Sequence, residues 1–144
     1  MRIAIASDHG GFSLKEDLRQ YLKGEGHDVV DLGTDSEASV DYPIYGQKCA
    51  QYVVDGKADK GIVLCGTGIG ISIAANKVKG ARCALCTSET LAELAANHNA
   101  ANLIALGGRT TSFDEAVTYI EKWLSTPFDG GERHVKRVNM LNEL

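Results

Sequence analysis

The stretch from Lys60 to Ser72, KGIVLCGTGIGIS, constrains the fold of this chain more than any other segment. Its first half is short, apolar and rich in β-branched residues, which is typical of a strand buried on both faces of a parallel sheet. Glycines then alternate at positions 66, 68 and 70, and a helix-compatible segment runs from Ile71 to Lys77. A strand, a glycine turn and a helix start in this order present backbone N–H groups to an anion.

The residue that ends this predicted strand is Cys65. A thiol at that point lies near several backbone donors and a helix N-terminus, which favour the thiolate. A small free cysteine is also common in a hydrophobic core, so the stretch alone leaves a reactive and a structural role open. Ile71 stands where G-x-G-x-x-G requires a glycine, and no Gly-Lys-Ser/Thr ends the turn. The turn is therefore neither a dinucleotide fingerprint nor a Walker A loop.

The rest of the chain alternates strand-like and helix-like segments, with strands expected over 2–7, 27–32, 61–65, 81–86 and 102–106. Two S-x-x-E capping boxes, Ser13 with Glu16 and Ser112 with Glu115, open the helices that follow the first and fifth strands. This alternation predicts one domain over residues 1–144. It is an α/β fold, a three-layer α/β/α sandwich with a Rossmann-like five-stranded parallel sheet and a C-terminal helical tail. The inward helix faces are expected to carry Leu14, Leu18, Leu22, Tyr45, Cys49, Tyr52, Val53, Leu91, Leu94, Ala95, Phe113, Val117, Ile120 and Leu124.

Charge and cysteine content limit the partners and the compartment. A net charge of −4 argues against a general nucleic-acid or anionic-membrane binder, and no apolar run approaches the ~20 residues of a membrane span. The four cysteines show no secreted-scaffold pattern, so we expect reduced thiols in a cytoplasmic protein. Cys83 and Cys86 have C-x-x-C spacing, but inside a strand they face opposite sides, which disfavours a redox or zinc pair.

Polar and reactive residues follow several of the predicted strands. Ligands of parallel sheets bind outside the carboxyl ends of the strands, so we expect one cluster at that edge. Two arginines four residues apart in the tail suit a phosphate dianion, although alone they fit a solvated helix face better. His98 lies at a helix end, where it could equally act as a C-terminal cap. The candidate cluster consists of Asp8, His9, Cys65, Gly66, Thr67, His98, Asn99, Arg109, Arg133, His134 and Arg137.

Five segments taken together and in order closely resemble the ribose-5-phosphate isomerase B family, which includes the galactose-6-phosphate isomerase subunits. They are SDHGGFSLKEDL, DYPIYG, GIVLCGTGIGISIAANK, NHNAANLIALGGR and GGERHVKRV, and the resemblance covers essentially the whole chain. It implies an aldose–ketose isomerase that needs no metal or cofactor. The implied reaction interconverts D-ribose 5-phosphate and D-ribulose 5-phosphate through a cis-enediolate.

The resemblance also implies roles for the matching residues. Cys65 moves the proton from C2 to C1, Thr67 shifts protons between O1 and O2, and His98 opens the furanose ring with Asp8 on that side of the site. A homodimer or dimer of dimers is implied, in which His98, Asn99 and Arg109 face the partner's Cys65. The implied substrate-binding residues are His9, Asp41, Tyr42, Gly66, Gly68, Ile69, Gly70, Asn99, Arg109, Arg133 and Arg137.

Other functions remain open at this stage. Within the same family, allose 6-phosphate or galactose 6-phosphate could be the substrate. From another class, a flavodoxin-like phosphate- or nucleotide-binding module would use the glycine turn and need neither Cys65 nor His98. A redox protein using Cys83 and Cys86 is a third hypothesis, which the expected strand geometry disfavours.

Overall fold

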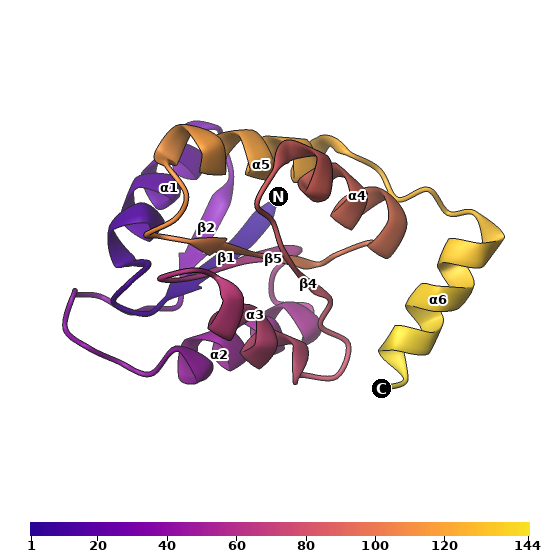
Figure 1. Cartoon of the computed structure of the whole chain (residues 1–144), viewed down its shortest axis with the longest axis horizontal. Helices are drawn as coiled ribbons and strands as arrows, with labels where there is room; N and C mark the ends of the chain where they lie inside the picture. Colours follow the sequence, from indigo (N-terminus) through magenta and orange to yellow (C-terminus); the bar gives the residue numbers. More distant parts are fainter.

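Five parallel strands form one sheet in the order β2-β1-β3-β5-β4 (Figure 1). The computed structural model describes all 144 residues. The strands are β1 (Arg2–Ser7), β2 (Asp28–Asp31), β3 (Lys60–Cys65), β4 (Cys83–Leu85) and β5 (Leu103–Gly107). The helices are α1 (Phe12–Gly24), α2 (Tyr42–Val54), α3 (Ile69–Asn76), α4 (Glu89–Asn99), α5 (Phe113–Ser125) and α6 (Glu132–Asn142). All five predicted strands are confirmed, with β1 unchanged and the ends of the others differing by at most two residues.

Helices cover both faces of the sheet, so the three-layer sandwich is confirmed. α1, α4 and α5 share one core with the sheet, and α2 and α3 share the other (Figure 1). Successive strand residues face opposite sides, so Ile3 and Ile5 enter the first core while Ala4 and Ala6 enter the second. β2 and β3 flank β1 on either side, and such a reversal of strand order opens a crevice at the carboxyl ends of the strands.

The sheet ends at β4, and a side chain occupies part of its outer edge. Asn76 donates from Nδ2 to the carbonyl oxygen of Cys83 at 2.9 Å, and its Oδ1 accepts from the Cys83 N–H at 2.8 Å. The amide therefore takes the place that a neighbouring strand would otherwise have. At the other edge, β2 begins and ends with aspartates, which discourage further strand pairing.

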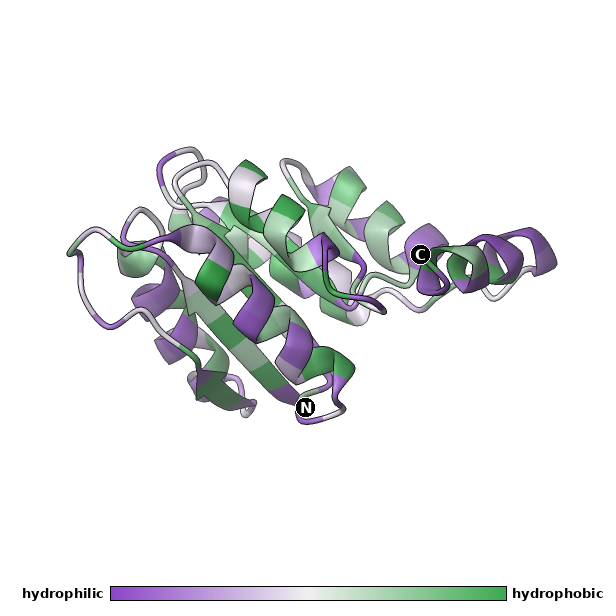
Figure 2. Ribbon diagram, turned by 90° about the horizontal axis from the view of Figure 1, so that it is seen from below, coloured by the Kyte–Doolittle hydropathy of each residue, from purple (hydrophilic) through white to green (hydrophobic).

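The last helix lies outside the three layers. α6 projects beyond the sheet and is largely hydrophilic, with hydrophobic bands between (Figures 1 and 2). Only His134 and Val138 of this helix are buried. The predicted helical tail is therefore present as a separate arm that meets the body through the end of α4. No helix of the chain has both the length and the apolar character to cross a membrane.

The two predicted capping boxes have different outcomes. At Ser112 the box is confirmed: its hydroxyl accepts from the Glu115 N–H at 3.2 Å and the Glu115 carboxylate accepts from the Ser112 N–H at 2.9 Å. At Ser13 the prediction is wrong, because α1 already begins at Phe12 and has no side-chain cap. Glu16 is instead drawn to the cations of Lys15 and Arg19.

The buried faces of two helices also differ from the prediction. α4 turns Ala92, Ala95 and Ala96 toward the sheet, and Leu91 and Leu94 are 45% and 37% exposed. Small alanines allow α4 to pack closely, which leaves the leucines on the outer side. α5 buries Ala116, Tyr119, Ile120 and Trp123, while the predicted Phe113 lies at its rim against Tyr21. The predicted faces of α1 and α2 are confirmed by Leu14, Leu18, Leu22, Cys49 and Val53.

Candidate active site

Three loops meet at the carboxyl edge of the sheet, above β1, β3 and β5. A side chain at Gly10 would lie 3.0 Å from the nitrogen of Gly66, and one at Gly108 would overlap the carbonyl oxygen of Gly10. The N–H of Gly108 donates to the Cys65 carbonyl oxygen at 2.8 Å, and the N–H of Arg109 donates to that of Gly66 at 2.9 Å. Backbone packs on backbone here, so each loop fixes the position of the next.

Cys65 lies at the centre of this edge. It ends β3, is 5% exposed, and accepts a hydrogen bond on its sulfur from the N–H of Gly68 at 3.2 Å. Gly68 has φ of 81°, a left-handed conformation that glycine adopts without strain. The hydroxyl of Thr67 accepts from the N–H of Ile69, the first residue of α3, at 3.3 Å. The sulfur thus belongs to the core beneath α2 and α3 and also faces a helix N-terminus.

Asp8 and His9 follow β1 at the same edge. The buried carboxylate of Asp8 accepts from the N–H groups of Gly10 and Gly11 at 2.9 and 3.1 Å, both through Oδ1. His9 accepts on Nδ1 from the N–H of Val40 at 3.2 Å. Because an accepting ring nitrogen carries no proton, Nε2 of His9 is left as its donor.

Three further predicted residues surround the glycine turn. Tyr42 packs on it, since a side chain at Gly70 would come within 2.6 Å of the tyrosine Cζ. Asp41 is the N-cap residue of α2, but its side chain bonds no helix N–H. Nη1 of Arg109 lies 3.2 Å from the point where a Cβ on Gly66 would stand. The carboxyl edge therefore carries Asp8, His9, Asp41, Tyr42, Cys65, Gly66, Thr67, Gly68, Ile69, Gly70 and Arg109.

His98 and Asn99 lie at the opposite edge of the sheet. α4 returns the chain from the carboxyl end of β4 to the start of β5, so its last residues lie at the amino edge. The N–H of Gly61, at the start of β3, donates to the carbonyl oxygen of Asn102 at 3.0 Å. Cys65 is at the other end of β3, and the five steps between its six residues, at about 3.3 Å each, span about 17 Å.

The remaining predicted residues, Arg133 and Arg137, accompany His98 at the amino edge. The ring of His134 on α6 stacks on that of His98, with centroids 4.5 Å apart and planes at 14°. Nε2 of His134 lies 3.4 Å from Oδ2 of Asp129. Burial, and then the neighbouring His98, lowers the pKa of His134. Arg133 and Arg137 are exposed on α6, and neither takes part in an ion pair of the chain.

The prediction of one cluster at one edge is therefore wrong for a single chain. Cys65 and its neighbours form one group, and His98, Asn99, Arg133 and Arg137 form a second group at the far end of the strands. Arg109 was expected with His98 and Asn99, but it lies beside Gly66 of its own chain. The difference arises because strand ends and the ends of crossover helices lie at opposite edges of a parallel sheet.

The structure connects two further residues to the second group. The sequence placed His134 in the candidate cluster, between the two tail arginines, but gave it no role. Arg82 bonds to the main chain at the end of α4. Its partners come from distant segments, so no local pattern indicated it.

The other thiols differ from Cys65 in their surroundings. Cys83 packs against the core beneath α2 and α3, whereas Cys86 belongs to the core on the other face, so the predicted divergence of this pair is confirmed. All four cysteines are free. Burial raises the pKa of the Cys49 thiol to about 12 and that of Cys86 to about 11, and it also raises the pKa of Cys83. No three His, Cys, Asp or Glu side chains converge as a metal site.

Comparison with known proteins assigns the chain to a family. The family model described as Ribose/Galactose Isomerase matches residues 3–141. The chain belongs to this family. Ribose-5-phosphate isomerase B of Escherichia coli is 40% identical over 143 residues, which cover 99% of this chain and 95% of that protein. The chain is therefore an enzyme of the isomerase class, and a regulatory phosphate-binding module is set aside.

Solved structures of relatives have the same fold. Ribose-5-phosphate isomerase B of Clostridium thermocellum superposes with a TM-score of 0.97 at 49% identity, over 99% of this chain and 96% of that one. The Mycoplasma genitalium enzyme, solved with bound ribulose 5-phosphate, has a TM-score of 0.93 at 40% identity, over 99% and 94%. The resemblance seen in the sequence and the predicted fold class are both confirmed.

Proposed function

We propose that this enzyme interconverts D-ribose 5-phosphate and D-ribulose 5-phosphate through a cis-enediolate. The observation that carries the proposal is the sulfur of Cys65, held at the start of α3 with the Gly68 N–H 3.2 Å away. A base in that position faces the dipole of a helix N-terminus, which stabilises nearby negative charge. The ribulose 5-phosphate bound to the Mycoplasma genitalium relative supports a pentose substrate.

Proton transfer at this site needs no outside oxidant. The thiolate of Cys65 takes the proton from C2 of the open-chain aldose, and the released electron pair forms the C1=C2 bond while O1 becomes negative. Unpaired N–H groups of the first turn of α3 face this charge, and losing one such donor costs ~3–4 kcal/mol in comparable sites. The thiol then returns the proton to C1. The Thr67 hydroxyl relays the O2 proton to O1, and O2 becomes the ketone oxygen.

Two chains complete each active site in this proposal. Within one chain, His98 is about the length of β3 away from Cys65 and cannot open the ring of a sugar held at that sulfur. We therefore assign Asp8, His9, Cys65, Thr67 and Arg109 to one subunit of a homodimer. The other subunit supplies His98 for ring opening, Asn99 for the anion, and Arg133 and Arg137 for the phosphate. Phosphate binding is remote from the bond changes, so its energy can position C1 and C2.

The outer face of α4 supports this assembly. Leu91, Leu94 and His98 are three and four residues apart, so they share one side of the helix. Both leucines are exposed in the single chain. A required histidine in line with exposed apolar side chains fits a surface that a second copy covers.

The substrate is tested with a coupled isomerase assay on ribose 5-phosphate, allose 6-phosphate and galactose 6-phosphate, with and without EDTA. We expect the highest kcat/KM with ribose 5-phosphate and no effect of the chelator. A higher kcat/KM with either hexose phosphate would contradict the pentose assignment. Activity lost in EDTA and restored by a divalent ion would contradict a metal-free reaction.

The division between subunits is tested with heterodimers of Cys65→Ala and His98→Asn chains, isolated through two different affinity tags. Each homodimer should be nearly inactive. The heterodimer contains one site in which both residues are intact, so it should recover about half of the unmodified activity. Purified heterodimers without recovery would show that each site is built within one chain.

A further inference from the structure

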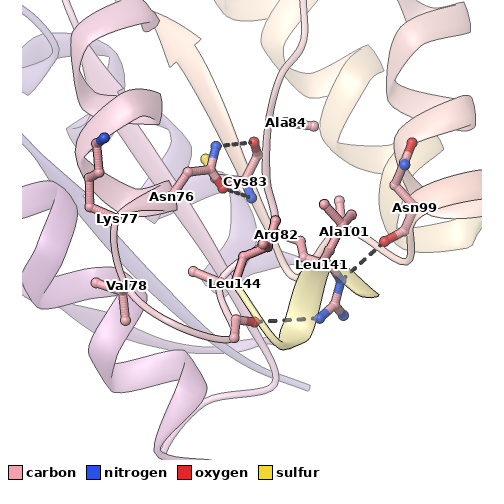
Figure 3. Close-up of a pocket in the computed structure, with 12 residues that line it drawn as sticks. Asn76, Lys77, Val78, Arg82, Cys83, Ala84, Asn99, Ala101, Leu141 and Leu144 are labelled. Atoms are coloured by element: carbon pink, nitrogen blue, oxygen red, sulfur yellow. Dashed lines mark hydrogen bonds between the residues drawn. The ribbon is translucent and has the colours of Figure 1, made fainter. Parts of the chain in front are cut away.

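Arg82 directly precedes β4, and its guanidinium donates hydrogen bonds to the end of α4 (Figure 3). Nε donates to the carbonyl oxygen of Asn99 at 3.2 Å, and Nη2 donates to that of Ala100 at 2.9 Å. Nη1 donates to the carbonyl oxygen of Gly80 at 3.4 Å and to Oδ1 of Asn142 at 2.6 Å. None of these partners is a carboxylate, so the cation is held by main-chain and amide oxygens alone.

Two of the bonded carbonyls, those of Asn99 and Ala100, belong to the turn that directly follows His98. The last carbonyl groups of a helix have no partner within the helix, and here Arg82 supplies the donors. Ala100 has φ of 45° and is the one non-glycine residue of the chain in the left-handed region. Such a conformation persists only where the surroundings fix it. The indole N–H of Trp123 completes the set by donating to the Ala101 carbonyl oxygen at 3.0 Å.

Arg82 also links this turn to the projecting helix. Asn142 is the last residue of α6, and His134 near its start stacks on His98. α6 is therefore attached to α4 at both of its ends, directly through the ring stack and indirectly through Arg82. Few other contacts hold α6, because only His134 and Val138 are buried.

We propose that Arg82 is a positioning residue of the isomerase reaction. It holds the end of α4, and so the side chains of His98 and Asn99, in the arrangement that the partner's half of the site requires. This inference rests on the proposed function, which gives His98 and Asn99 their tasks. Four of the five guanidinium N–H groups of Arg82 already donate within the chain, which leaves one for any other partner. Its planar fork spreads the donors over three nitrogens that reach separate segments, whereas a lysine has its three donors on a single nitrogen.

The first experiment compares Arg82→Ala and Arg82→Lys with Lys77→Ala. Arg82 and Lys77 line the same cavity of about 580 Å³, but the Lys77 side chain makes no hydrogen bond, so its variant is the matched control. Displacement of a group that acts on the substrate costs up to about 100-fold in rate. We expect kcat to fall about 10- to 100-fold in both Arg82 variants, with KM changed less than about threefold. Lys77→Ala should change neither constant.

The second experiment asks which half of the site Arg82 serves. A heterodimer of Arg82→Ala and Cys65→Ala chains has one site in which Cys65, Arg82 and His98 are all intact, so it should recover about half of the unmodified activity. In a heterodimer of Arg82→Ala and His98→Asn chains, each of the two sites receives its His98 half from an altered chain. Its activity should therefore stay low. A variant that merely damaged the whole fold would lower the activity of both heterodimers.

The outcomes separate this inference from the proposed function. An unchanged kcat in Arg82→Ala, or equally low activity in both heterodimers, overturns the role of Arg82. If Cys65→Ala with His98→Asn shows no recovery, the shared site is wrong, and Arg82 is judged by its kcat-against-KM split alone. If Arg82→Ala does not fold, Arg82→Lys undergoes the same measurements, with melting temperature recorded for every variant.

Discussion

The two edges of the sheet that carry the candidate site are built in different ways. At the carboxyl edge, one continuous segment ends a strand, turns on glycines and starts α3, and neighbouring loops pack on its backbone. At the amino edge, the end of α4 is held by Arg82, Trp123 and α6, which are distant in the sequence. A local motif therefore creates the first group, whereas tertiary contacts create the second. The following predictions test that contrast, beginning with the largest effect.

Cys65→Ala should have the largest effect, and that effect should be limited to the catalytic step. Loss of a general base lowers kcat by ~10²–10⁴-fold, while binding of ribose 5-phosphate and the melting temperature should change little. The measurements are kcat, ligand affinity and thermal unfolding on the same preparations. A variant that melts much earlier but keeps most of its kcat would show that Cys65 serves packing, and the carboxyl edge would lose its role in catalysis.

The remaining cysteines provide an internal control for this position. The raised pKa values of Cys49, Cys83 and Cys86 keep these thiols protonated near neutral pH, so they should resist iodoacetamide in the folded protein. We expect one alkylated residue, Cys65, inactivation in step with its labelling, and protection by ribulose 5-phosphate. Labelling of Cys86 before Cys65, detected by peptide mass spectrometry, would contradict the assignment.

Arg137→Ala should show the second largest effect. It alters the amino edge and should weaken substrate binding. A charge-assisted hydrogen bond contributes about 1.5–3 kcal/mol, so its loss should raise KM for ribose 5-phosphate about 10- to 100-fold with a smaller change in kcat. Lys136→Ala, one residue away on the exposed side of α6, is the matched control and should leave KM unchanged. Equal KM values for both variants would make α6 a solvated helix without a phosphate site.

A pair of serine substitutions tests how far local sequence determines the carboxyl edge, where both α1 and α5 begin. Ser112→Ala removes a formed capping box and should lower the free energy of unfolding by about 1 kcal/mol. Ser13→Ala removes no cap and should cost much less. Urea unfolding of the two variants measures the difference, and equal losses would mean that Ser13 also caps α1 in solution.

The smallest expected effect is a pH dependence of stability that arises from His134. Its pKa is lowered in the folded state, chiefly by burial. Below the ordinary histidine pKa of about 6.5, the unfolded chain therefore binds a proton that the folded chain does not. Stability should fall as the pH decreases below that value, and it should recover as the pH rises. His134→Gln should make the melting temperature depend less on pH in this range. An unchanged dependence would contradict the assignment to His134.

Much of the fold was predictable because it depends on local patterns. Short apolar runs such as residues 61–65 specified the strands, and Ser112 with Glu115 specified the start of α5. The Ser13–Glu16 prediction failed because α1 already begins at Phe12, and Glu16 pairs with Lys15 and Arg19 of the same helix. The prediction that Leu91 and Leu94 face inward was wrong, because hydrophobicity does not distinguish a helix face on the sheet from one left exposed on a single chain.

The candidate site was predictable only in its parts. Cys65 ends a strand, and Asp8, His9, Thr67 and Arg109 follow strands, so the rule of parallel sheets brings them to one edge. His98 ends a helix and the tail arginines belong to an arm, so the same rule does not apply to them. Arg82 has no sequence signal because its role depends on carbonyl groups, which every residue has.

The side-chain amide of Asn76 limits how copies of this chain can associate. It bonds both main-chain groups of Cys83, as a sixth strand would, so these groups of β4 are not free to pair with another polypeptide. Free sheet edges invite open-ended polymerisation, in which each added chain presents a new edge to the next. Because that route is restricted, the contact between copies that we propose would use helix surfaces such as those of α4 and α6. Such surfaces can close on themselves and give assemblies of fixed size rather than fibres.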